Sequence, residues 1–148
     1  MLFQYSLQQE VVRLIKIVEE DFSMEEVLLR LKTGEAGAIV SFLGVVKSLR
    51  EGDIVNELIV EAYKEVAEEK LMEIRKEALK KFDIIDAVII HRIGRLKPLE
   101  NIVLVAVSSR TRKSAFEACS WIIDEVKAKA PIWKKEITPK GGRWVRGA

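Results

Sequence analysis

The sequence has very few of the residues that build disulfides and metal sites. Its 148 residues include one cysteine, Cys119, and one histidine, His91. A single cysteine cannot form an internal disulfide, and one cysteine with one histidine is too few for the usual zinc sites. The sequence therefore predicts no metal, and its sparing use of cysteine fits a reducing compartment such as the cytoplasm.

Long apolar runs and an excess of one charge are also missing. No apolar stretch approaches the length of a membrane span, and residues 1–5 lack the charged head and apolar core of a signal peptide. The 25 basic and 23 acidic residues leave a net charge of +2, which gives no electrostatic reason to expect binding to nucleic acid or a membrane. We expect a cytoplasmic protein that binds neither.

What the sequence does contain is typical of a globular domain. Hydrophobic residues make up 49% of the chain and charged residues 32%, and a chain of this length can bury a real core. We find no repeat, low-complexity tract or linker. The sequence therefore predicts one domain over residues 1–148, with residues 1–10 as a candidate N-terminal extension.

Apolar periodicity predicts an alternation of strands and helices. The predicted strands are 11–18, 38–46, 55–63, 84–93, 102–108 and 132–137, and the predicted helices are 23–32, 65–82 and 112–129. Ser23 and Glu26 have the spacing of a capping box, and Gly44 inside a strand indicates a bulge or a close approach of another group. This order favours an α+β domain with a largely antiparallel sheet and packed helices.

Several lysines gather around a structural break late in the chain. Lys127 lies in the last turn of a predicted helix, Pro131 cannot continue that helix, and Lys134 belongs to the strand that follows. Lysines held on ordered elements can bind an anion, or transfer protons if burial lowers their pKa. A lysine in a last helical turn also simply complements the helix dipole, so the residues alone leave both interpretations open.

Other candidates are weaker. Residues 108–112 run from a strand end into a helix N-terminus, where an anion can bind and an arginine can clamp it; a capped helix with exposed arginines is the alternative, with Ser109 or Thr111 as the cap. His91 is either an acid–base group or, as is commoner, a hydrogen-bonded structural residue. Cys119 is best interpreted as a packing residue. The three tryptophans form either a stacking platform or part of a core or interface.

Seven segments then carry a resemblance to a known family. They are 37–46 (GAIVSFLGVV), 61–63 (EAY), 91–94 (HRIG), 107–109 (VSS), 114–118 (SAFEA), 130–136 (APIWKKE) and 143–145 (RWV). Each is weak alone, but the ordered set, with its spacing, resembles the large, catalytic subunit of molybdopterin synthase from about Val11 to Val145.

This resemblance implies a fold, a partner and a reaction. The fold is an α/β-hammerhead, and the protein is a homodimer. Each end of the dimer binds a small ubiquitin-like subunit, which gives a heterotetramer. The Gly-Gly tail of the small subunit, carried as a thiocarboxylate, enters a pocket on the large subunit. Two sulfur atoms pass to cyclic pyranopterin monophosphate to form molybdopterin, and the transfer needs no metal or organic cofactor.

The resemblance also implies individual site residues. The two essential lysines of the family fall on Lys127 and Lys134, its helix arginine on Arg112 and its pocket phenylalanine on Phe42. Two substrate-binding positions depart from the family pattern.

At the first of these positions Lys47 replaces an arginine, which keeps the charge but loses the bidentate fork. At the second, Thr111 replaces a histidine and cannot act as an imidazole acid or base. A non-catalytic dimeric scaffold that only binds the small subunit is therefore the alternative. A nucleic-acid binder and a different enzyme acting on a phosphate ligand also stay open.

Helix geometry adds a constraint on where these residues can meet. Arg112 and Lys127 are fifteen residues apart on one predicted helix, which separates them by roughly 22 Å along the axis. They cannot easily touch one small substrate from the same chain. If both belong to one site, a symmetric dimer must bring Arg112 of one chain to Lys127 and Lys134 of the other.

Overall fold

The computed structural model describes residues 14–145, so the predicted extension 1–10 and the start of the predicted strand 11–18 lie outside it. Three helices are described: α2 (Met24–Leu31), α3 (Lys64–Lys81) and α4 (Arg112–Lys129). The strands are β1 (Ile15–Val18), β2 (Ala38–Val45), β3 (Leu49–Arg50), β4 (Asp53–Ile54), β5 (Glu57–Ala62), β6 (Asp86–Arg92), β7 (Gly94–Leu96), β8 (Asn101–Ser109), β9 (Ile132–Thr138) and β10 (Gly141–Val145).

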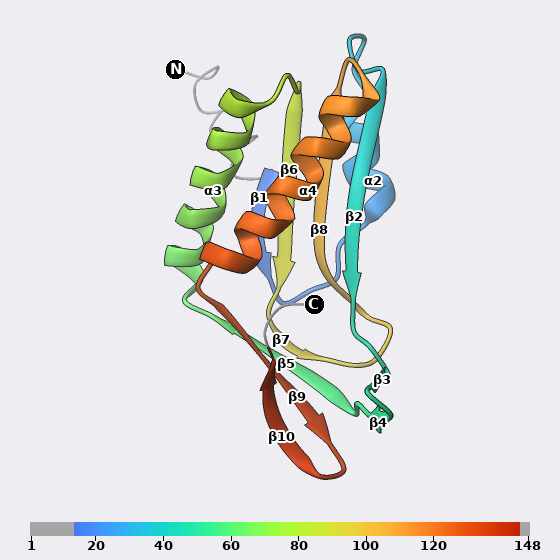
Figure 1. Cartoon of the computed structure of the whole chain (residues 1–148), viewed down its shortest axis with the longest axis vertical. Coiled ribbons are helices and arrows are strands. Elements are labelled where there is room, and N and C mark those ends of the chain that lie inside the picture. The colour runs from blue at the N-terminus through green and yellow to red at the C-terminus, as the bar shows by residue number, and fades with distance from the viewer. Residues whose placement is uncertain (1–13, 146–148) are drawn as a thin grey trace.

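A four-stranded sheet with helices on both faces forms the larger part of the molecule. Its strand order is β1-β6-β8-β2; β1 pairs with β6 in parallel and the other pairs are antiparallel. Helices α3 and α4 cross one face, and α2 lies behind the other (Figure 1). The predicted strands 84–93 and 102–108 thus form an antiparallel pair, β6 with β8.

Burial of this sheet on both faces explains the continuous apolar runs of its central strands. Ile89 and Val105 belong to the core shared with α3 and α4, whereas Ile90 and Leu104 belong to the second cluster, beneath α2. Successive residues of one strand point to opposite faces, so every position of β6 and β8 needs a side chain that tolerates burial. His91 continues the alternation on the α4 side.

A second, antiparallel sheet extends from the end of the first (Figure 1). Its order is β10-β9-β5-β7, and a small β3–β4 hairpin lies beside it. The chain enters this sheet directly from α4, because Pro131 separates the end of the helix from Ile132, the first residue of β9. The α+β class with largely antiparallel sheets is confirmed.

Local details confirm some expectations and correct others. The Ser23 hydroxyl accepts from the Glu26 amide at 3.2 Å, as the capping box predicted. The expected cap of α4 is wrong: Thr111 occupies the N-cap position without a side-chain bond, and the Ser109 hydroxyl accepts instead from the Thr111 amide. Three short strands fall between the predicted ones: β7 follows β6, and the β3–β4 hairpin lies between β2 and β5.

Gly44 marks a bulge, as the sequence suggested. The register between β2 and β8 shifts between Gly44 and Val45. A methyl group at position 44 would lie 2.7 Å from Cγ1 of Val103, a β-branched side chain with little rotameric freedom. The glycine therefore lets the two strands approach at the point where β8 begins to line the cavity described below.

Gly44→Ala should destabilise the fold by about 1–3 kcal/mol, because the added methyl group overpacks a stiff neighbour. Gly34→Ala is the matched control, since nothing lies within 4 Å of a Cβ there. Urea unfolding of both variants measures the effect. Equal midpoints for the two variants would contradict the close-approach explanation.

Candidate functional site

A cavity of about 460 Å³ lies where the end of α4 meets both sheets. Its wall comes from the last turns of α4, from β6 and β8 of the first sheet, and from β9 and β10 of the second. The lining residues are His91, Val103, Ile123, Val126, Lys127, Ala128, Ala130, Ile132, Trp133, Lys134 and Val145. Many of these residues are apolar, but the surface they expose to the cavity is mostly polar, and converging polar groups in a cavity fix the orientation of a small ligand.

The helix break brings the two predicted catalytic lysines to this cavity. Lys127 lies in the last turn of α4, and Lys134 is the third residue of β9, so Pro131 and its neighbours turn the chain between them. The Lys127 ammonium group lies 5.8 Å from the ring centroid of Phe42, on β2. The structure thus brings together three of the six residues expected from the sequence.

Lys134 is the unusual member of this group, because its side chain is only 9% exposed. Burial, and secondly the positive charge of Lys127, lower the pKa of Lys134 from 10.5 to about 8. An amine with such a pKa exchanges a proton readily near neutral pH. Lys134 is therefore not a solvated surface lysine.

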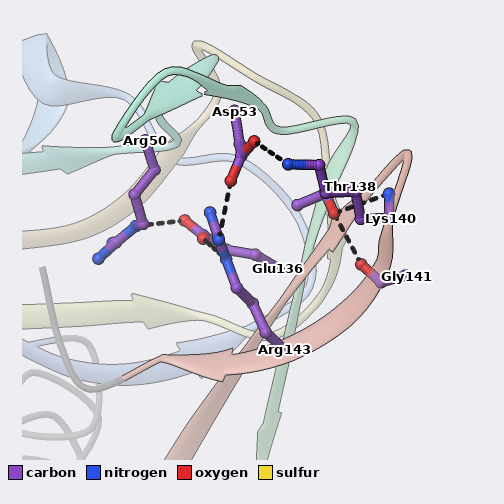
Figure 2. A network of polar contacts seen from close by, with 7 residues as sticks. All are labelled: Arg50, Asp53, Glu136, Thr138, Lys140, Gly141 and Arg143. Atoms are coloured by element: carbon purple, nitrogen blue, oxygen red, sulfur yellow. Dashed lines mark hydrogen bonds and ion pairs between the residues drawn. The ribbon is translucent and has the colours of Figure 1, made fainter.

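A cluster of charged side chains anchors the strand that carries Lys134 (Figure 2). Glu136 is 3% exposed and accepts from Nε of Arg50 at 2.8 Å and from Nε of Arg143 at 3.1 Å. Asp53 accepts from Lys140 and Arg143 at 3.2 and 3.3 Å. These bonds tie the β3–β4 hairpin to β9 and β10.

This cluster escaped sequence analysis, although a signal for it existed. Lys134, Glu136 and Thr138 alternate along β9 and point to one face, which is the buried one. Charged residues at every second position of a strand that packs on its neighbours indicate a buried polar network, but the partners come from segments distant in sequence.

Lys47 reaches the same region from another side. It is exposed, and it lines a small cavity of about 20 Å³ together with Lys134, Glu136 and Arg50. The hairpin held by Glu136 follows Lys47 in the chain. Lys47 is therefore close to the lysine pair, as the substrate-binding expectation requires.

Arg112 and Thr111 lie elsewhere. Both are exposed at the N-terminus of α4, the opposite end of the helix from Lys127 (Figure 1). Of the other residues at this expected anion site, Arg110 already pairs with Glu35 at 2.9 Å and with Asp83 at 3.6 Å. Within one chain, the structure does not bring Arg112 or Thr111 to the cavity.

The remaining candidates from the sequence are Cys119 and the three tryptophans. The Cys119 thiol is buried, and burial raises its pKa to about 11, as suits a packing residue. The tryptophans form no common platform: Trp121 packs on Phe82, Trp133 on Tyr63, and Trp144 contacts Lys135.

No group of three or more His, Cys, Asp or Glu residues within 14–145 could hold a metal ion. None of the helices in that range is long and apolar enough to cross a bilayer.

Lys134→Met should raise the free energy of unfolding at pH 7 by about 1–3 kcal/mol, because it removes a buried charge whose pKa is lowered on folding. The sign follows from proton binding. Between pH 8 and 10.5 the unfolded chain holds the proton more tightly, so the stability of the wild type rises with pH relative to that of the variant.

The gap between wild type and Lys134→Met should therefore close as the pH rises from 8 to 10.5. Denaturant unfolding at several pH values measures it, with Lys16→Met, an exposed strand lysine, as the control. A Lys134→Met variant less stable than wild type at pH 7 would contradict the assigned cost of burial.

Comparison with known proteins identifies the family of the chain. The model of the family described as MoaE protein matches residues 17–129. The chain is 48% identical over 128 residues to the molybdopterin synthase catalytic subunit of Pyrococcus abyssi, covering 86% of each chain. A molybdopterin synthase structure from Staphylococcus aureus superposes with a TM-score of 0.86 at 36% identity, over 93% of this chain and 99% of that one.

A third similarity concerns the fold alone. A Helicobacter pylori structure, described as the protein–protein complex of subunits 1 and 2 of molybdopterin-converting factor, matches with a TM-score of 0.73 at 20% identity, over 90% of each chain. The family model and the Pyrococcus relative both span most of the sequence. The chain belongs to the MoaE protein family.

Proposed function

We propose that this chain is the catalytic subunit of a molybdopterin synthase, a sulfurtransferase of molybdenum cofactor biosynthesis. The observation that carries the proposal is the lysine pair at the cavity: Lys127 from α4 and Lys134 from β9 supply two cationic groups to one pocket. Fixed cations in such a pocket stabilise developing negative charge far better than they would in water. Membership of a family whose named relatives are molybdopterin synthase catalytic subunits supports the same reaction.

The proposed partner is a small sulfur-carrier subunit with a Gly-Gly tail that ends in a thiocarboxylate. The related Helicobacter pylori protein is described as a complex of two subunits, which supports a partner of this kind. The tail would enter the cavity beside Lys127 and Lys134, where an anionic sulfur meets two ammonium donors. The acceptor is cyclic pyranopterin monophosphate, and the cytoplasm is the proposed compartment.

Lys127 and Lys134 differ in burial, which supports a different role in sulfur transfer for each. Lys127 is exposed at the cavity and lies over the Phe42 ring, so it is suited to hold the incoming thiocarboxylate. Lys134 is buried with a pKa of about 8, so it is suited to give or accept a proton as the sulfur is transferred. Lys47, which lines a small cavity with Lys134, would contact the substrate phosphate in this proposal.

The complete site requires a second chain in this proposal. Arg112 and Thr111 lie at the far end of α4 from the lysine pair, roughly 22 Å along the helix axis. In a symmetric dimer Arg112 of one chain can reach the cavity of its partner and clamp the phosphate there. Homodimerisation within a heterotetramer would then be a condition of catalysis.

The direct test is a sulfur-transfer assay with the thiocarboxylated small subunit, in which the pterin product is followed by mass. Wild type should add two sulfur atoms, and Lys127→Ala should lose at least about a hundredfold in kcat, because a charge that stabilises the transition state is removed. Lys76→Ala, an exposed lysine on α3, is the matched control and should retain activity.

Normal activity of Lys127→Ala would refute the assignment of this lysine. A wild type that binds the small subunit but transfers no sulfur would identify the non-catalytic scaffold, for which the replacement of the family histidine by Thr111 is the supporting feature.

Mixed dimers test the composite site. A dimer of one Arg112→Ala chain and one Lys127→Ala chain keeps one cavity with every group intact, so it should retain about half of the wild-type activity, whereas either variant alone should be nearly inactive. Differently tagged chains allow purification of the mixed species. If mixed dimers of folded chains were inactive, the two-chain site would be wrong.

A further inference from the structure

His91 lies on the wall of the lysine cavity, a place the sequence did not predict for it. It occupies the penultimate position of β6, opposite Val103 of β8 and Ile17 of β1, and its residue is 2% exposed. Its ring lines the same cavity as Lys127 and Lys134. The hydrogen-bonded structural role favoured by the sequence therefore does not explain why the ring also lines the lysine cavity.

The hydrogen bonding of the ring defines its tautomer. Nδ1 lies 2.8 Å from the carbonyl oxygen of Arg92, and because a carbonyl can only accept, Nδ1 must carry the proton. The Arg92 guanidinium is itself held by the Glu19 carbonyl at 3.0 and 3.2 Å and by the Asn101 carbonyl at 3.1 Å. This anchored segment fixes the orientation of the ring, and in the neutral imidazole Nε2 is then an acceptor.

The surroundings keep the ring neutral. Burial, and secondly the positive charge of Lys134, lower the pKa of His91 to about 3. The strand partners on either side, Ile17 and Val103, are apolar, and the charged groups that share the cavity are Lys134 of β9 and Lys127 of α4. At neutral pH the cavity thus presents ammonium donors to a neutral acceptor.

The ammonium groups of Lys127 and Lys134 are possible hydrogen-bond donors, and Nε2 of His91 is a possible acceptor for them. Among residues 14–145, neither Lys127 nor Lys134 makes an ion pair or a hydrogen bond to another side chain, and Nε2 of His91 has no protein donor. A buried ammonium group without an acceptor is costly, and a hydrogen bond to it reduces that cost. His91 is the uncharged group on the cavity wall best suited to accept one.

We propose that His91 is a positioning residue for sulfur transfer: after a rotation of the Lys134 side chain, which the structure leaves unbonded, Nε2 of His91 accepts a hydrogen bond from the ammonium group and aims that group at the ligand in the cavity. The catalytic part of this inference rests on the proposed function, but the hydrogen bond itself does not. An anionic carboxylate at the same place would pair with Lys134 and neutralise it, whereas a neutral imidazole orients the amine and leaves its charge available.

The test compares two replacements of similar size. His91→Phe removes the acceptor, whereas His91→Gln can place its amide oxygen near the former Nε2. In His91→Phe the pKa of Lys134, followed by NMR of its side-chain carbon, should fall by at least half a unit. The kcat for sulfur transfer should fall about tenfold with little change in KM for the small subunit. His91→Gln should recover part of both effects.

Ile90→Val, on the same strand but facing the α2 cluster, is the control and should change neither quantity. A merely structural role predicts the opposite pattern: an unchanged Lys134 pKa, and a Gln variant as impaired as the Phe variant. That result would overturn the inference. If wild type transferred no sulfur while His91→Phe still shifted the Lys134 pKa, the proposed function would fail and the contact would stand.

The wild-type fold offers an independent measurement if both variants fail to fold. Long-range nitrogen–proton NMR of the imidazole should show a neutral ring protonated on Nδ1, and the Nε2 shift should move in Lys134→Met. A ring protonated on Nε2, or an Nε2 shift that does not respond to the loss of Lys134, would contradict the proposal.

Discussion

The site depends on one constraint: Lys134 is buried close enough to Lys127 for the positive charge of Lys127 to lower its pKa. Lys134 is almost fully enclosed, and Lys127 faces the same cavity from the end of α4. Two like charges at such a place oppose folding, so the surrounding structure must hold them there. The break at Pro131 contributes to this, because it turns the chain from helix to strand between Lys127 and Lys134 and so fixes where the two lysines lie.

The charged cluster around Glu136 supplies the rest of the restraint. Glu136 lies two residues after Lys134 and accepts hydrogen bonds from Arg50 and Arg143. These bonds tie β9 both to the β3–β4 hairpin and to its neighbour β10 (Figure 2). The stability of the cluster thus offsets the cost of a nearby buried amine. The buried position of Lys134 is unfavourable for its charge, and the charged cluster around Glu136 holds the strand that carries it.

Sequence reasoning recovered what depends on local order. The periodicity of 112–129 predicted α4, which spans the same residues, and Ser23 capped α2 as expected. The sequence predicted the break at Pro131 between Lys127 and Lys134. It did not predict the burial of Lys134, because that burial depends on β6, β8 and β10 meeting α4 in space. For the same reason the Arg50–Glu136–Arg143 bonds and the place of His91 on the cavity wall escaped prediction. The helix N-terminus at 108–112 pointed to an arginine, but the resemblance chose Arg112 and singled out Phe42.

The most direct test of this account is an NMR titration of the Lys134 side chain in the wild type and in Lys127→Gln. The account predicts a pKa of about 8 in the wild type and a higher value in the variant, because the removal of a nearby positive charge favours the protonated amine. A Lys134 that titrates near 10.5 in both proteins would contradict the buried, coupled lysine pair on which the proposed chemistry depends.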